Sequence, residues 1–290
     1  MVTNKSLSII VPVSKMAGKL DLLKHWLLEL LNENIQVILV HDYKDEDTQV
    51  ELLEIVSSSK LKNLELLVVK TDSPGGARNA GLAVATGEWL AFWDSDDYPE
   101  VEKIYDSVLT SKEDTEIIIG CFEKYNVTSG MNTKVVLTSR PLFSIGLNPG
   151  IWRMVFRRKI LGQIQFSNLL MGEDQYFLSQ LDLPSRRIVY SEEIFYHYYV
   201  GRSSQLTANR KAIDHLYQNC KDTYRTAQNS NQANYEFVLV MVARQIFTGL
   251  KHSSILIRIK IFFLFLSIVI TARGKVAKIF LDTFSAIVRN

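Results

Sequence analysis

The sequence predicts an α/β fold, in which a mostly parallel sheet is flanked by helices and followed by a helical C-terminal tail. Short, continuous apolar runs alternate with stretches of helical periodicity over the first hundred residues. Continuous runs are typical of strands that are buried on both faces of a parallel sheet. Beyond residue 207 the pattern is helical to the end. Such alternation also predicts a ligand crevice at the carboxyl ends of the strands.

The individual elements follow from the same patterns. We expect strands at residues 7–13, 35–40, 64–69, 88–93, 115–120 and 187–200. Apolar residues at helical spacing predict helices at residues 20–31, 48–56, 76–86, 101–109, 150–159 and 173–181. Gly87 directly follows the third of these helices, and we expect it to be the C-cap. Tyr196, Tyr198 and Tyr199 lie in the last strand, where they fit either core packing or a platform for an acceptor.

The charge of the chain is unevenly distributed. The formal net charge is only +2, which excludes a protein whose whole surface binds nucleic acid. Seven basic residues and one acidic residue fall in 251–290, a net charge of +6, which leaves −4 for the first 250 residues. The two cysteines have no metal-ligand or disulfide-framework spacing, and the N-terminus lacks a signal-peptide pattern. We therefore expect a cytoplasmic location.

The tail contains a dense apolar segment. Residues 261–272 (IFFLFLSIVITA) are apolar for twelve positions, so a helix of that length spans about 18 Å of a hydrocarbon core that is about 30 Å thick. Extending the segment toward residue 255 includes Arg258 and Lys260, which are costly inside a membrane. From residue 252 we expect peripheral contact with the inner face of the cell membrane. Packing on the body or on a second subunit and a tilted span are the alternatives.

The most informative polar motif is DSDD, residues 94–97, directly after an apolar run. In an extended segment, Asp94 and Asp96 can turn toward one divalent cation. Mg²⁺ or Mn²⁺ takes one or two carboxylates and fills its other positions with diphosphate oxygens and water. For the isolated motif, a solvated acidic turn is the alternative.

The context of this motif resembles a known family. The run GGARNAGLAVATGEWLAFWDSDD, residues 75–97, resembles the nucleotide-sugar-binding half of family 2 glycosyltransferases, inverting enzymes of GT-A fold, here of the bacterial cell-surface polysaccharide type. SIIVPV (8–13) and VILVHDYKDED (37–47) look like the family's opening strand, second strand and base-binding loop. MGEDQYF (171–177) is similar to its Glu-Asp motif, and Trp152 begins a Trp-x-x-x-Phe-Arg-Arg pattern common in bacterial members.

The resemblance implies a domain division and a role for each matching residue. It implies a glycosyltransferase domain at residues 1–207, with a nucleotide-sugar half at 1–98 and an acceptor half at 99–207, before a helical region at 208–290. Asp174 would be the catalytic base, and Glu173 and Trp152 would bind the acceptor. The metal ligands would be Asp94, Asp96 and His197, and the nucleotide sugar would be bound by Pro12, Val13, Asp42, Arg78, Asp94, Ser95 and Arg202. For Arg78, capping or pairing with an acid is the alternative.

The implied activity is metal-dependent, inverting transfer of a hexosyl or N-acetylhexosaminyl group. The donor would be a nucleoside-diphosphate sugar, and a UDP-sugar is favoured. The cofactor would be Mn²⁺ or Mg²⁺, and the acceptor would be a glycan or a lipid-linked molecule. The Gln-x-x-Arg-Trp motif of processive members is absent, so we expect a non-processive enzyme, with a homo-oligomer left open.

Two other functions remain as alternatives. The chain could be a non-catalytic nucleotide-sugar-binding subunit of a membrane glycan-assembly complex. It could also be a nucleotidyltransferase, which would require a glycine-rich phosphate loop immediately after the first strand. Residues 12–18 (PVSKMAG) do not resemble such a loop.

Overall fold

A computed structural model describes residues 6–202, 209–272 and 275–289. The chain divides into two compact units. The first contains residues 1–137, 151–165 and 187–202, and the second contains residues 138–150, 166–186 and 203–290. The second unit therefore includes two segments that precede the predicted domain boundary at residue 207, and this boundary lies outside the described residues.

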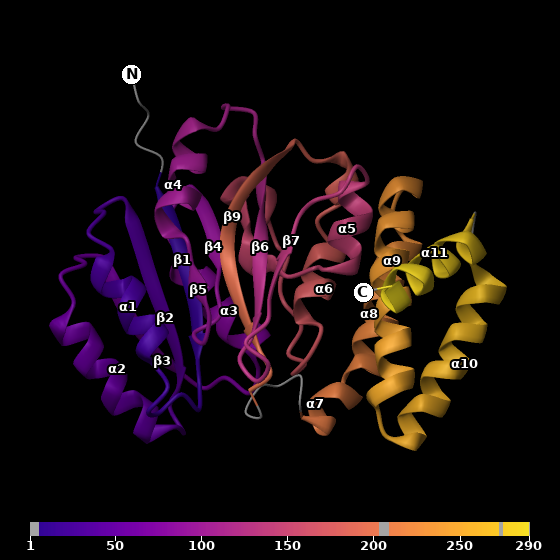
Figure 1. Cartoon of the computed structure of the whole chain (residues 1–290), viewed down its shortest axis with the longest axis horizontal. Coiled ribbons are helices and arrows are strands. Elements are labelled where there is room, and N and C mark those ends of the chain that lie inside the picture. Colours follow the sequence, from indigo (N-terminus) through magenta and orange to yellow (C-terminus); the bar gives the residue numbers. More distant parts are fainter. Residues whose placement is uncertain (1–5, 203–208, 273–274, 290) are drawn as a thin grey trace. The chain divides into compact units, whose positions relative to one another are not determined.

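Within the described residues, nine strands form one sheet, in the order β3-β2-β1-β4-β8-β6-β9-β5 with β7 on β6 (Figure 1). Strand β1 is parallel to β2 and β4, β2 is parallel to β3, and β8 is antiparallel to β4 and β6. The predicted α/β class is confirmed. The strands are β1 (Leu7–Val13), β2 (Ile35–Asp42), β3 (Leu64–Val69), β4 (Trp89–Phe92), β5 (Tyr98–Pro99), β6 (Ile117–Asn126), β7 (Asn132–Val135), β8 (Met154–Arg157) and β9 (Ile188–Val200).

Helices cover both faces of the parallel part of this sheet. The helices are α1 (Asp21–Glu29), α2 (Glu46–Ser58), α3 (Pro74–Val84) and α4 (Val101–Thr110). Side chains of α1, α2 and α4 share one hydrophobic core with alternate residues of β1. Helix α3 packs on the other face, where a Cβ at Gly81 would lie only 2.5 Å from Cγ2 of Ile10. Burial on both faces explains the continuous apolar sequence of β1, β2 and β4.

The helix predicted at residues 150–159 is wrong. The structure places β8 there, between two 3₁₀ turns at Ile151–Arg153 and Arg158–Ile160. All four residues of β8 are buried, and the strand pairs with β4 and β6. Periodicity does not distinguish a strand from a buried helix in so short an apolar run. Here the pairing with β4 and β6 determines that the segment is a strand, and both partners are distant in sequence.

Gly87 is not the C-cap that the sequence predicts. Helix α3 ends at Val84, and its C-cap is Ala85. A Cβ at position 87 would lie 2.5 Å from the backbone nitrogen of Ser8. The glycine is therefore required because the chain passes directly against β1 as it enters β4.

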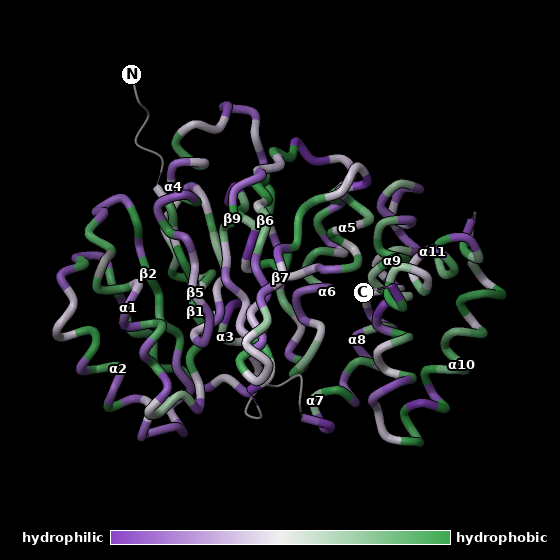
Figure 2. Tube along the Cα trace, in the orientation of Figure 1, coloured by the Kyte–Doolittle hydropathy of each residue, from purple (hydrophilic) through white to green (hydrophobic). Residues whose placement is uncertain are grey.

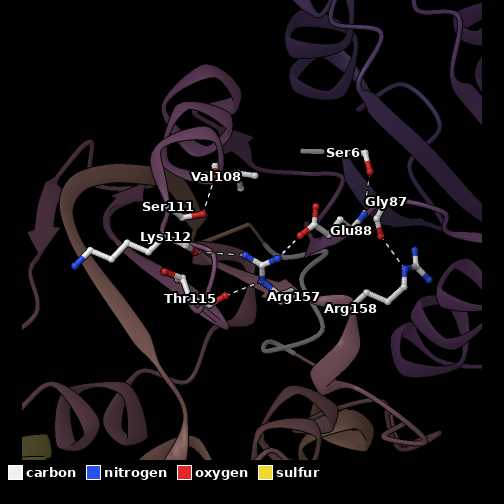
Figure 3. A network of polar contacts seen from close by, with 9 residues as sticks. All are labelled: Ser6, Gly87, Glu88, Val108, Ser111, Lys112, Thr115, Arg157 and Arg158. Carbon is white, nitrogen blue, oxygen red and sulfur yellow. Dashed lines mark hydrogen bonds and ion pairs between the residues drawn. The ribbon is translucent and has the colours of Figure 1, made fainter. Parts of the chain in front are cut away.

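Arg157, at the end of β8, connects the segments that lead into β4 and β6 (Figure 3). Its Nε donates a hydrogen bond to the carbonyl oxygen of Thr115 over 2.7 Å, and its guanidinium group forms an ion pair with Glu88. The guanidinium carbon lies 4.6 Å from the ring centre of Trp89. Next to it, Nε of Arg158 donates to the carbonyl oxygen of Gly87 over 2.7 Å. The Arg-Arg pair of the Trp-x-x-x-Phe-Arg-Arg pattern thus fixes chain segments within the first unit.

We expect Arg157→Met to lower the free energy of unfolding by about 2–3 kcal/mol, because the buried carbonyl of Thr115 loses its charged donor. Arg187→Met is a matched control, since the pair of Arg187 with Asp114 is exposed and such pairs contribute about 0–1 kcal/mol. Urea denaturation of both variants measures the difference. Equal losses in the two would contradict a structural role for Arg157.

The described part of the second unit is helical. Helices α5, α8, α10 and α11 pack against the long helix α9, which confirms the predicted C-terminal helices. Figure 2 shows that α10 is hydrophobic along much of its length. None of the helices in the described ranges is both long enough and apolar enough to cross a membrane. The bounds are α5 (Pro141–Leu147), α6 (Glu173–Ser179), α7 (Arg210–Asp214), α8 (Leu216–Gln228), α9 (Gln232–His252), α10 (Ile255–Thr271) and α11 (Val276–Arg289).

Candidate active site

The carboxyl ends of the parallel strands bring several predicted site residues to one edge of the sheet. Val13 lies opposite His41 in the β1–β2 register, so Pro12, Val13 and Asp42 share this edge. Strand β4 is parallel to β1 and ends at Phe92, so the DSDD loop begins at the same edge. This is the arrangement that the alternation of strands and helices predicts.

Arg78 is positioned by α3. The helix begins after Ser73, whose Oγ accepts the N–H of Gly76 over 3.0 Å. One turn later, Arg78 is 4% exposed, and its Nη2 lies 2.6 Å from Oδ1 of Asp94. A buried, charge-assisted contact of this kind fixes the orientation of the carboxylate. Pairing with an acid, the alternative that the sequence leaves open for Arg78, is thus present.

Strand β9 holds the DSDD loop at both of its ends. The Oη of the fully buried Tyr196 accepts the N–H of Asp94 over 2.9 Å. Oδ1 of Asp97, which is 1% exposed, accepts the N–H of Tyr199 over 2.8 Å. Beyond the strand, Nη1 of Arg202 donates to the backbone oxygen of Asp96 over 2.7 Å and lies 3.4 Å from its Oδ2. The loop that carries Asp94 and Asp96, two of the three predicted metal ligands, is therefore fixed from β9.

Five charged groups gather here: Arg78, Asp94, Asp96, Asp97 and Arg202, which we call the β4 cluster. Burial, and secondly the charge of Asp94, raise the pKa of Asp96, while Arg202 opposes this shift. Burial, and then the charges of Asp96 and Asp94, raise the pKa of Asp97 well above its ordinary value. Three carboxyl groups face two guanidinium groups, so an added cation would relieve their mutual repulsion.

The donor set of this cluster suits a hard divalent cation. Within the parts of the chain that the structure describes, no group of three or more His, Cys, Asp or Glu side chains is arranged to hold a metal ion. Asp94 and Asp96 would therefore supply only part of a coordination shell. Mg²⁺ is commonly held by one or two carboxylates, with substrate phosphates and water as the other ligands, so the residues fit an ion that arrives with a diphosphate.

His197 is already engaged by two carboxylates. Its Nε2 lies 2.8 Å from Oε1 of Glu100, and its Nδ1 lies 3.3 Å from Oε2 of Glu123. The predicted role of His197 as a metal ligand stays a prediction, and it would require one of these contacts to open.

Trp152 belongs to an aromatic stack in the first unit. Its ring lies 4.6 Å from that of Tyr196 and 5.2 Å from that of Tyr198, both at an interplanar angle of 21°. Phe122 meets it edge-on at 4.7 Å. The ring is half-buried, and its role in acceptor binding stays a prediction.

Glu173 and Asp174 lie in the second unit, whereas the β4 cluster lies in the first. They open α6, after Gly172 in a left-handed conformation (φ +85°). A Cβ at Gly172 would lie 2.4 Å from Nδ2 of Asn219, so both φ and packing require glycine. Oδ1 of Asp174 accepts the N–H of Gln175 over 2.8 Å, and Glu173 is 9% exposed. The predicted helix start is confirmed, and the roles of Asp174 as the base and of Glu173 in acceptor binding stay predictions.

The sequence does not identify two residues that organise this site, Asp97 and Tyr196. In the DSDD motif, nothing distinguishes Asp97 from the other acidic residues or indicates its contact with Tyr199. The contact between Tyr196 and Asp94 joins positions about a hundred residues apart, and only the pairing of β9 with β5 and β6 brings them together. No local pattern could have shown it.

The family assignment comes from comparison with known proteins. The sequence profile of Glycosyl transferase family 2 matches residues 8–171, more than half of the chain. The chain belongs to this family. Glycosyltransferase GlyA from Streptococcus pneumoniae is 22% identical over 227 residues, which cover 70% of this chain and 32% of the relative. This family 2 chain thus spans about a third of the length of GlyA.

Solved structures of similar fold include proteins in complex with nucleotides or nucleotide sugars. One is residues 1–349 of Staphylococcus aureus TarS in complex with UDP. It matches with a TM-score of 0.65 and 21% identity, and the match covers 83% of this chain and 72% of the TarS chain. The mannosyltransferase PcManGT from Pyrobaculum calidifontis, in complex with GDP-Man and Mn²⁺, matches with a TM-score of 0.59 and 12% identity, over 99% and 81% of the two chains. The expected GT-A fold of this family 2 chain is confirmed.

Proposed function

We propose that the protein is an inverting, non-processive glycosyltransferase that moves a sugar from a UDP-sugar to a glycan or a lipid-linked acceptor. The observation that carries the proposal is the β4 cluster, where Asp94 and Asp96 lie at the carboxyl edge of the sheet between two guanidinium groups. Both aspartates fall inside the residues that match the family. TarS, of similar fold, is solved with UDP, which supports a uridine nucleotide as the donor's carrier.

The proposed donor site extends along the edge of the sheet. Pro12, Val13 and Asp42, at the ends of β1 and β2, bind the nucleoside. Ser95 and Arg202 bind toward the diphosphate, and the contact of Arg202 with Asp96 keeps its guanidinium group at the loop. These five residues orient the donor, which is a large part of the catalytic effect of a two-substrate enzyme.

The leaving group is stabilised at the β4 cluster. A bound Mn²⁺ or Mg²⁺ supplies charge neutralisation for the departing diphosphate, and the Mn²⁺ in the PcManGT structure supports such an ion in this fold. Asp94 and Asp96 would hold it. Arg78 holds Asp94 in one orientation, and Tyr196 fixes the backbone of the same residue. Rigid, preorganised groups of this kind favour the charge that develops in the transition state.

On the acceptor side, Asp174 is the proposed base. Its carboxylate takes the proton of the acceptor hydroxyl while the acceptor oxygen bonds to the anomeric carbon, and the bond to the diphosphate breaks with its electron pair on the diphosphate oxygen. A single displacement of this kind inverts the anomeric configuration. Glu173 and Trp152 are proposed to bind the acceptor.

The loop after β1 disfavours a nucleotidyltransferase. Its consecutive N–H groups are taken by side chains of the loop before α2 and of α2 itself, as Lys15 donates to Oδ2 of Asp45 over 2.5 Å and Gly18 donates to Oε1 of Glu51 over 2.6 Å. Between them, Met16 and Ala17 both donate to Oγ1 of Thr48 over 3.0 Å. A phosphate loop would present these groups to its ligand.

A donor panel tests the proposal. We expect a UDP-sugar with Mn²⁺ to raise the melting temperature, because a ligand that binds the folded state stabilises it, and we expect release of free UDP when acceptor is present. GDP-mannose at the same concentration is the control. Binding without release of any nucleoside diphosphate, across a panel of glycan and lipid-linked acceptors, would favour the alternative of a non-catalytic binding subunit.

A further inference from the structure

Helix α10 exposes a continuous apolar face. At 3.6 residues per turn, its eight exposed apolar residues fall within an arc of about 140°. Their exposed fractions range from 37% at Leu266 to 82% at Ile270. We call this surface the α10 face, and it consists of Ile255, Leu256, Ile259, Phe262, Phe263, Leu266, Val269 and Ile270. Contiguous exposed apolar surfaces are common at interaction sites.

The opposite side of α10 is already packed. Ile261 and Ile268 are 1% and 0% exposed, and the helix lies against α8 and α9. A Cβ at Gly249 of α9 would lie 2.3 Å from Cδ1 of Ile261, so a glycine at this position allows the close approach of the two helices. On α11, the ring of Phe280 lies 5.3 Å from that of Phe265. The helix is therefore held along one side, and the α10 face points away from the core of the second unit.

Basic residues border the α10 face. By helical position, Arg258 flanks one edge and Lys260 the other. Arg258 is held by a hydrogen bond from its Nε to the carbonyl oxygen of Ser253 over 2.8 Å, and Nζ of Lys260 lies 5.8 Å from the ring centre of Tyr217. The sequence of α10 contains no acidic residue. The one acid in 251–290, Asp282, contacts Arg140 of the same unit at 3.6 Å.

From this combination we infer that the α10 face binds the surface of an anionic lipid membrane, with the helix axis in the membrane plane. Phe262, Phe263 and their aliphatic neighbours would enter the boundary between headgroups and acyl chains, while Arg258 and Lys260 reach the phosphate groups. A helix whose other side is packed on α8 and α9 offers only one face to the lipid. The inference does not depend on sugar transfer.

A second copy of the chain fits the α10 face less well. In a symmetric dimer the same surface meets itself. Both facing surfaces would then carry Arg258 and Lys260, with no carboxylate on α10 to pair with them. Anionic headgroups supply the missing negative charge, so charge complementarity favours lipid.

Flotation of the full chain with vesicles tests the inference. We expect binding to vesicles of phosphatidylcholine and phosphatidylglycerol at 3:1, and much weaker binding to phosphatidylcholine alone. The double variant Ile259→Glu/Phe263→Glu should reduce the partition coefficient at least about tenfold, and Lys260→Gln about fivefold at low salt. The matched control is Val50→Glu/Leu53→Glu, which places two charges at comparably exposed positions of α2 and should bind as the wild type does.

Several results would overturn the inference. The first is that the wild type does not float with anionic vesicles, and the second is that the α2 control loses as much vesicle binding as Ile259→Glu/Phe263→Glu. The third is that the wild type forms a dimer without lipid, as measured by sedimentation equilibrium, and that Ile259→Glu/Phe263→Glu converts this dimer to a monomer. The last would assign the α10 face to a second copy. Circular dichroism confirms that the variants fold, and UDP-dependent thermal shift is measured separately. If the wild type does not bind UDP, the proposed function is refuted, whereas the inference about vesicle binding is unaffected.

Discussion

Asp174→Asn is expected to lower the turnover number by about 10²-fold or more, the usual scale of general-base catalysis, and to leave the affinity for the nucleotide sugar nearly unchanged. The amide keeps the size of the side chain, and its Oδ1 still accepts the N–H of Gln175 at the start of α6. It no longer takes up a proton from the acceptor. The defect therefore belongs to the chemical step, which steady-state kinetics at saturating donor measures directly.

Two further variants separate this defect from general damage to the second unit. Asp222→Asn, on α8, removes a carboxylate that pairs with Arg225 at 3.4 Å, and it should turn over normally. Glu173→Gln should act mainly through the Michaelis constant of the acceptor. Normal turnover by Asp174→Asn, or a product whose NMR spectrum shows retention of the donor's anomeric configuration, would rule out Asp174 as the base of a single displacement.

Chelation of divalent cations is expected to abolish sugar transfer, and added Mn²⁺ or Mg²⁺ to restore it. Asp94 and Asp96 provide two carboxylates, which leave most of a six-coordinate shell to the diphosphate and water. The ion should therefore bind weakly until the nucleotide arrives. Initial rates in excess EDTA, followed by titration with each metal, measure the requirement.

Substitution links this requirement to the β4 cluster. Asp96→Asn should shift the Mn²⁺ concentration for half-maximal rate upward by about tenfold or more, since one anionic ligand is lost. Asp72→Asn, at a side chain that is 76% exposed, should leave it unchanged. Full activity in excess chelator would remove the ion from the mechanism.

The part of the fold that the sequence predicts best is the parallel half of the sheet. Strands β1 and β3 have the predicted bounds, and β2 extends two residues beyond them. Strands β1 and β2 are buried on both faces and carry their signal in their own residues, whereas β3, at the edge of the sheet, is only partly buried. The DSDD loop follows from β4 in the same way, and the structure places it, as predicted, at the carboxyl edge of the parallel strands.

The rest depends on pairing between distant segments. Strand β8 is only four residues long, and its identity is decided by β4 and β6 on either side. The contact of Arg78 with Asp94, and that of Tyr196 with the backbone of Asp94, likewise join separate elements. Their geometry is a property of the assembled sheet, and local sequence carries little of it.

Strand β8 also limits how the chain around Trp152 could be redesigned. Trp152 precedes the strand and joins the aromatic stack, while Arg157 ends it and anchors the segments before β4 and β6. A strand advances about 3.3 Å per residue and alternates its faces, so one inserted residue would displace Trp152 and invert its direction relative to Arg157. Length variation is thereby confined to exposed turns such as that between β6 and β7. If Trp152 binds the acceptor as proposed, a new acceptor preference at this position would have to come from substitutions at fixed chain length.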